Sequence, residues 1–123
     1  MTKKKILIVD DSNTNIVLLE SLLKRNGYTV FTALNGRQGL DSVSNIIPDL
    51  VILDLKMPDL GGFEFLEVLK KQGDLMDIPV VILSAISDSD SIKKSLELGA
   101  ADYLSKPLDP DKVLKLADTI LNQ

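Results

Sequence analysis

ILIVDDS, residues 6–12, decides the fold: four consecutive apolar residues stop abruptly at two carboxylates. The stretches LVILD (residues 50–54) and VVILS (residues 80–84) have the same form, an apolar run closed by a polar residue. Because these runs are continuous rather than alternating, they are typical of strands buried on both faces of a sheet. Residues 101–104 form a weaker run, and the half-polar, β-rich segment Tyr28–Ala33 predicts a less buried strand.

Segments with the apolar spacing of helices lie between these runs. Gly27, Pro48 and Gly99 stand where three of them should end, and Asp109 with Pro110 stands where the last should begin. The apolar positions are Ile16, Leu19 and Leu23; Leu40, Val43 and Ile47; Phe63, Leu66 and Leu69; Ile92 and Leu96; and Val113, Leu116, Ala117, Ile120 and Leu121. The fourth stripe is thin, so we expect its helix to be the loosest.

Strand and helix therefore alternate five times along 123 residues. This rhythm predicts an α/β fold, a parallel sheet with helices on both faces joined by right-handed crossovers. The length suits one domain, and we expect residues 1–123 to form it, with no linker and no output domain.

Composition excludes several classes of function. The net charge of −4 disfavours direct binding to nucleic acid or to an anionic membrane surface. The chain has no cysteine, hence no disulfide or zinc–thiolate site, and no histidine, hence no histidine base or phosphohistidine of its own. The first apolar run stops at Asp10, so no membrane or secretory segment is expected, and a reducing cytoplasm suits the chain.

The residues that close the apolar runs carry the chemistry. In an open parallel sheet the carboxyl ends of the strands share one edge, where ligands bind. Asp10, Asp11, Asp54, Ser84 and Lys106 should meet there. Taken singly, Asp11 is more simply a helix cap and Lys106 a solvated amine. Five such residues at strand ends favour a site instead.

Three carboxylates in one pocket repel each other unless a cation lies among them. Oxygen ligands without His or Cys select a hard ion, and Mg²⁺, which keeps waters and accepts a phosphate oxygen, fits better than a fully caged Ca²⁺. Lys106 can balance the charge of a phosphate. Asp54, which ends a central strand, is then the natural nucleophile for an aspartyl phosphate.

The whole chain resembles the receiver domains of response regulators in two-component signalling. Four blocks carry the resemblance: IVDDS (residues 8–12), DLKMPDLGG (54–62), LSA (83–85) and LGAADYLSKP (98–107). It implies a flavodoxin-like, doubly wound sheet of five parallel strands in the order 2-1-3-4-5, with five helices. It also implies a phosphorelay protein that is no enzyme, although it assists its own phosphorylation and dephosphorylation.

The resemblance assigns a role to each site residue. Asp54 would accept the phosphoryl group from a histidine kinase, a phosphotransfer protein or a small phosphodonor. Lys106 and Ser84 would contact that group, and Tyr103 would be the aromatic switch that turns inward when Ser84 moves. For Mg²⁺, Asp11, Asp54 and the backbone carbonyl of Lys56 would be direct ligands, and Asp10 would act mostly through water.

Further features follow from the same resemblance. The Lys106–Pro107 bond should be cis, and output should pass through the face of the fourth helix, fifth strand and fifth helix. Ser84 stands where threonine is commoner, which leaves the ring of Tyr103 more freedom, and Gly61 stands where a small polar residue is usual. The side chains of Lys56 and Ile86 would tune the lifetime of the phosphoryl group.

Three alternatives remain. A metal-dependent phosphohydrolase also uses a strand-end aspartate, but usually has a second Asp two residues later, where this chain has Lys56. A degenerate receiver that binds partners without phosphorylation tends to lose one residue of the set Asp11, Asp54, Ser84 and Lys106. A small flavoprotein shares the fold class, but no Ser/Thr-rich phosphate loop follows the first strand.

Overall fold

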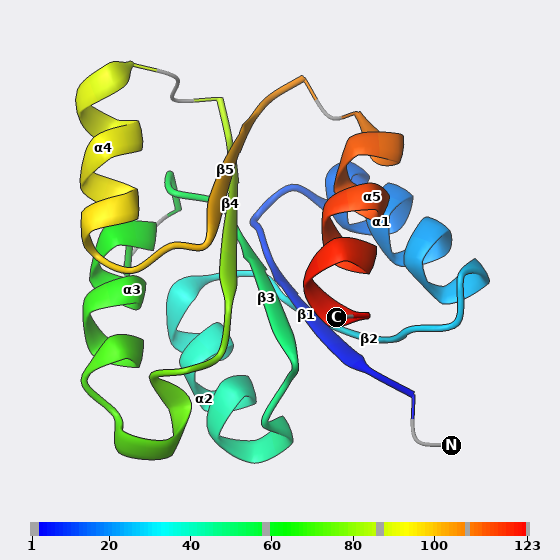
Figure 1. The fold of residues 1–123 in the computed structure, drawn as a ribbon, viewed down its shortest axis with the longest axis horizontal. Helices are drawn as coiled ribbons and strands as arrows, with labels where there is room; N and C mark the ends of the chain where they lie inside the picture. Colours follow the sequence, from blue (N-terminus) through cyan, green and yellow to red (C-terminus); the bar gives the residue numbers. More distant parts are fainter. Residues whose placement is uncertain (1–2, 58–59, 86–87, 108, 123) are drawn as a thin grey trace.

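The computed structural model describes residues 3–57, 60–85, 88–107 and 109–122. Its five strands pair in parallel in the order β2-β1-β3-β4-β5, which confirms the predicted flavodoxin-like fold (Figure 1). The strands are β1 (Lys5–Val9), β2 (Thr29–Ala33), β3 (Leu50–Leu53), β4 (Val80–Ser84) and β5 (Asp102–Ser105). The helices are α1 (Asn13–Arg25), α2 (Gly36–Ile46), α3 (Gly62–Lys70), α4 (Ser89–Glu97) and α5 (Pro110–Leu121), with a 3₁₀ turn η1 (Gly73–Leu75) before β4.

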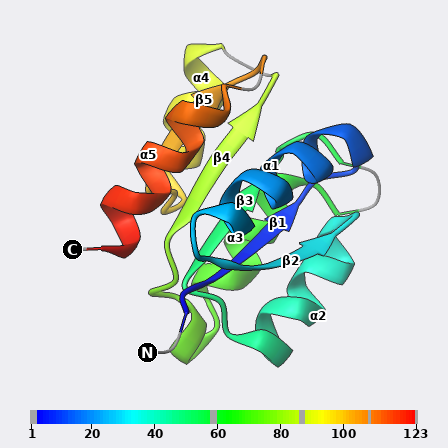
Figure 2. The ribbon, with the colours of Figure 1, turned by 90° about the vertical axis from the view of Figure 1, so that its right-hand side faces the viewer.

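The helices form two layers around the sheet. Helices α1 and α5 pack side by side on one face, and α2, α3 and α4 lie on the other (Figures 1 and 2). Side chains of β1 alternate between the layers: Ile6 and Ile8 pack in the α1/α5 core, and Leu7 and Val9 in the opposite core. Burial of both faces is the physical reason that the strands are continuously apolar.

The ends of the helices follow the predicted capping residues with one refinement and one error. Ser12, rather than Asp11, caps α1, since its side chain accepts a hydrogen bond from the Asn15 N–H. Asp109 caps α5, with Pro110 at its first position. The apolar spacing places Ile47 in the stripe of the second helix, which is wrong, because α2 ends at Ile46. Ile47 has φ 52°, which ends the helix in the left-handed region and turns its side chain outward, 52% exposed.

The fourth helix also corrects a prediction. The apolar spacing predicts that Leu96 faces the core, but it is 47% exposed, and the residue of α4 that is fully buried is Ser95. The Ser95 hydroxyl can be buried because it donates to the carbonyl of Ser91 at 2.9 Å. The core-facing stripe therefore runs one position earlier than predicted, and α4 contributes less apolar packing than the other helices.

None of the helices in the described ranges is long and apolar enough to cross a membrane.

Gly61, the position that departs from the usual receiver pattern, precedes α3 and makes no side-chain cap, but α3 still begins at Gly62.

Close packing of α3 against the end of β3 generates the first prediction. A Cβ on Gly62 would lie 2.6 Å from the Cα of Leu55 and 2.8 Å from the carbonyl oxygen of Asp54. We expect Gly62→Ala to lower the free energy of unfolding by about 1–3 kcal/mol, because backbone atoms must move to admit the methyl group. Urea denaturation measures this. Gly61→Ala is the matched control, because its Cβ would meet nothing nearer than 3.6 Å; equal losses in both variants would contradict the packing argument.

Candidate functional site

The strand register brings the predicted site residues to one edge of the sheet. Val9 of β1 pairs with Leu53 of β3, so Asp10 and Asp54 follow neighbouring positions, and the Asp54 N–H donates to the Val9 carbonyl at 3.0 Å. On the other side, the Lys106 N–H donates to the carbonyl of Ser84 at 2.8 Å. Asp10, Asp54, Ser84 and Lys106 are therefore brought together by backbone pairing, as predicted.

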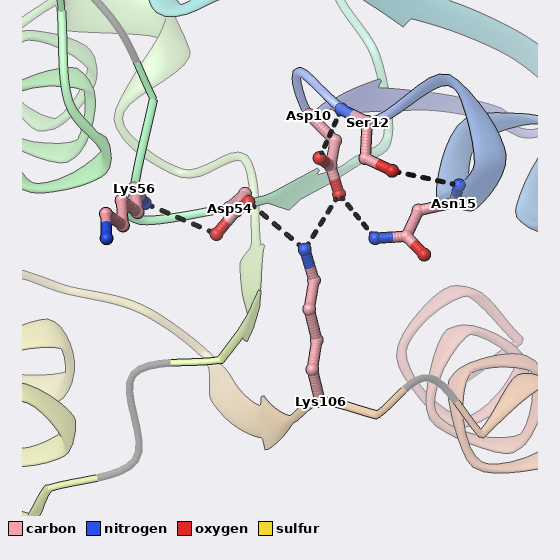
Figure 3. Close-up of polar contacts among 6 residues, drawn as sticks. All are labelled: Asp10, Ser12, Asn15, Asp54, Lys56 and Lys106. Carbon is pink, nitrogen blue, oxygen red and sulfur yellow. Dashed lines mark hydrogen bonds and ion pairs between the residues drawn. The ribbon is translucent and has the colours of Figure 1, made fainter.

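Asp10 is buried, 3% exposed, and its carboxylate is held from three sides (Figure 3). Its Oδ1 accepts a hydrogen bond from the Ser12 N–H at 2.9 Å. This bond closes a tight turn, and the turn places Ser12 to cap α1. Its Oδ2 accepts from the Lys106 ammonium at 3.4 Å and from the Asn15 side-chain amide at 3.5 Å. Asn15 is not among the predicted site residues. It lies five residues after the strand-end carboxylate, in the first turn of α1, where an asparagine is ordinary and gives no signal in the sequence.

Asp54 is the second carboxylate that contacts the Lys106 ammonium. It is 6% exposed; its Oδ2 accepts from Lys106 at 3.1 Å, and its Oδ1 accepts the Lys56 N–H at 3.3 Å. Burial lowers the pKa of Lys106, but the charges of Asp10 and Asp54 and their hydrogen bonds outweigh burial, and the net pKa is raised. Lys106 is therefore fully charged at neutral pH. The Lys106–Pro107 bond is cis, as predicted.

The carboxylates outnumber the ammonium. Asp10, Asp11 and Asp54 each place an oxygen within 4.8 Å of the other two, which is a spacing that can hold a metal ion. Three negative charges and one positive charge leave a local charge of −2, which a divalent cation would neutralise. Asp11 is exposed at the mouth of the cluster, so it can meet a hydrated ion. The donor set is all oxygen, which fits Mg²⁺.

The role of Lys56 as a backbone ligand stays a prediction. The backbone N–H of Lys56 donates a hydrogen bond to the Asp54 carboxylate, while the side-chain ammonium of Lys56 points away from that carboxylate (Figure 3). Ile86 lies outside the described residues, so its predicted tuning role also stays a prediction.

Ser84 and Tyr103 lie beside the cluster on the paired strands β4 and β5. Ser84 is fully buried, and the Tyr103 ring packs on the core with its hydroxyl shielded from solvent. Burial raises the pKa of the Tyr103 phenol; the Ser84 hydroxyl opposes that shift, and the charges of Asp88 and Asp54 add to it. The ring is thus already turned inward, next to the hydroxyl that the resemblance couples to it.

Comparison with known proteins identifies the family. Residues 6–118 match the response regulator receiver domain. The chain belongs to the response regulator receiver family. It is 42% identical over 113 residues to sporulation initiation phosphotransferase F of Bacillus subtilis, covering 92% of this chain and 90% of that protein. The structure of the chemotaxis response regulator CheY4 of Vibrio cholerae superposes with a TM-score of 0.91 at 31% identity, covering 98% of this receiver and all of that chain.

Other relatives are longer. The receiver is 39% identical over 120 residues to the alkaline phosphatase synthesis transcriptional regulatory protein PhoP of Bacillus subtilis, but it spans only 49% of that protein. Receivers of this family are signalling domains of two-component systems rather than classical enzymes; they depend on Mg²⁺ and interact with histidine kinases or phosphotransfer proteins and with downstream targets.

The shared ammonium generates the second prediction. Without Mg²⁺, Lys106→Met should lower the free energy of unfolding by about 3 kcal/mol, because two buried carboxylates lose their positive partner. Added Mg²⁺ should recover part of that loss, since the cation replaces the missing charge. Chemical denaturation with and without Mg²⁺ measures both effects. Lys112→Met, at an exposed position of α5, should change neither; a Lys106 variant as stable as the parent would refute the electrostatic account.

Proposed function

We propose that this receiver is a phosphorylation-activated switch in which Asp54 accepts a phosphoryl group from a histidine kinase or a phosphotransfer protein. One observation carries the proposal: the Asp54 carboxylate, buried at the strand-end edge, lies 3.1 Å from the Lys106 ammonium inside a cluster of net charge −2. A nucleophile and a fixed cation, with an excess of negative charge that a divalent cation would neutralise, suit phosphoryl transfer to a carboxylate.

The chain's own residues would take the following parts in the transfer. An oxygen of Asp54 forms the bond to phosphorus while the bond from phosphorus to the donor histidine nitrogen breaks. The electron pair of that bond stays on the nitrogen, and the donor leaves as neutral imidazole because its other ring nitrogen takes a proton from solvent. Lys106 is already on the Oδ2 of Asp54, so a short movement lets it follow the charge onto the phosphoryl oxygens. Ser84, at the end of the adjacent strand, would donate a hydrogen bond to the same group.

Asp11, Asp54 and the Lys56 carbonyl would hold Mg²⁺, with Asp10 acting through water. Bound there, the ion would neutralise the negative charge that the incoming phosphoryl group adds. The observations do not favour a phosphohydrolase. Such enzymes usually have a second Asp as acid or base two residues after the nucleophile, and the Lys56 side chain there is cationic and points away from Asp54.

Output is proposed to pass through the face of α4, β5 and α5. Phosphorylation adds about −1.5 to −2 charges, and two hydrogen bonds from Lys106 and Ser84 would be worth about 3–6 kcal/mol together. A two-state equilibrium shifts from 1:99 to 99:1 when about 5.5 kcal/mol is added in favour of the second state, so these two hydrogen bonds are of the size that such a switch needs. The exposed charges on this face, Lys93 (78%) and Glu97 (65%) on α4 with Lys112 on α5, suit a polar protein partner.

The third prediction tests the phosphoacceptor. Asp54→Asn should incorporate no label from a radioactive small phosphodonor, because the amide is not a nucleophile, and chelation of Mg²⁺ should give the same result in the parent chain. Asp74→Asn, an exposed carboxylate in η1 beyond α3, should label normally. Undiminished labelling of the Asp54 variant would disprove the assignment.

The fourth prediction tests the output face. With beryllofluoride and Mg²⁺ as a phosphoryl mimic, the largest change in amide exchange outside the pocket should lie within residues 86–103. The reason is that α4 has the weakest apolar anchoring. The Asp54→Asn variant is the control and should show no change. Changes concentrated in α1 and α2 would place the output on a different face.

A further inference from the structure

Asn15 is a neutral side chain that reaches the acidic cluster. It lies in the first turn of α1, and its Nδ2 is 3.5 Å from Oδ2 of Asp10 (Figure 3). A carboxylate only accepts hydrogen bonds, so the amide must present its N–H₂ side. The cap of α1 does not need this side chain, because the Ser12 hydroxyl accepts the backbone N–H of Asn15 instead.

The three donors on Asp10 are not equivalent. The Ser12 N–H holds Oδ1 at 2.9 Å and is fixed by the backbone turn. Among the residues that the structure describes, Oδ2 has two partners, Asn15 and Lys106, and Lys106 is the closer of the two. However, Lys106 is also bonded to Asp54 at a shorter distance, 3.1 Å, so its hold on Asp10 depends on what happens at Asp54.

We propose that Asn15 is a positioning residue: it retains the Asp10 carboxylate when Lys106 moves to a phosphoryl group on Asp54. This rests on the proposed function. Asp10 is 3% exposed, so an oxygen left by Lys106 has little access to solvent and would be costly to leave unpaired. The Asn15 amide is the donor already beside that oxygen. Held on both oxygens, Asp10 keeps its orientation toward the waters of a metal ion.

The chemistry of an amide suits this position. A lysine at position 15 would add a second positive charge and reduce the attraction for a divalent cation, and an aspartate would add a fourth carboxylate. Asparagine donates a hydrogen bond and leaves the local charge at −2. The effect of Asn15 should therefore be small in the resting protein and larger in the state with a phosphoryl group.

The experiment compares two properties of the same variants. Asn15→Leu removes the donor at similar size, and Asn15→Ala removes it without added bulk. Binding of beryllofluoride at saturating Mg²⁺, followed by amide chemical shifts, should weaken about three- to tenfold in both variants, as expected for one hydrogen bond of ordinary net strength at a separation of 3.5 Å. The urea midpoint of the metal-free protein should change little, because Lys106 still pairs with Asp10 there. Asn15→Gln, which keeps the amide, should bind more tightly than Asn15→Leu.

Asn13→Leu is the matched control, an exposed asparagine in the same turn of α1. It should bind the mimic as the parent does. The inference is overturned if the Asn15 variants bind like the parent, if Asn13→Leu weakens binding equally, or if the loss of binding only follows a loss of stability. If the parent chain itself binds no beryllofluoride, the proposed function fails, which distinguishes that failure from failure of the inference.

Discussion

One lysine shared between two buried carboxylates governs the chemistry of this receiver. The Lys106 ammonium lies 3.1 Å from Asp54 and 3.4 Å from Asp10, and it cannot neutralise both of them together with Asp11. Two like charges about 4 Å apart repel by roughly 4 kcal/mol at an effective dielectric of 20. The resting cluster therefore carries an excess of negative charge, which a divalent cation would neutralise.

The fold maintains that imbalance by fixing the backbone around it. Asp10 and Asp54 follow strands that are apolar on both faces, so neither can shift without moving buried side chains on two layers. Helix α3 also packs closely on the end of β3, because a Cβ on Gly62 would lie 2.8 Å from the carbonyl oxygen of Asp54. Carboxylates on such a frame cannot separate to relieve their repulsion, which keeps the site preorganised for positive charge.

The amino-acid sequence is enough to predict features that depend on backbone pairing. Parallel strands bring the residue after each apolar run to one edge, so the ends of the runs alone group Asp10, Asp54, Ser84 and Lys106. Features that depend on the exact phase of a helix cannot be predicted in this way. Leu96 and Ile47 fit an apolar stripe by type, but the end of α2 and the burial of Ser95 are set by tertiary packing. Asn15 escapes prediction because an asparagine in a first helical turn is ordinary.

Because its buried residue is Ser95, α4 has weaker apolar packing than α3. Leucine at a core position stabilises by about 1.5–3 kcal/mol through burial, and α3 buries Phe65, Leu66 and Leu69 in this way. The fully buried residue of α4 is instead Ser95, whose hydroxyl is satisfied within its own helix by Ser91, so displacement of α4 breaks no hydrogen bond of that side chain. A free-energy change of a few kcal/mol at Asp54 is small against the packing of α3, but it is comparable with the packing of α4. Since α4 packs against β5, the strand that carries Tyr103, we expect a change at the site to move this helix before any other.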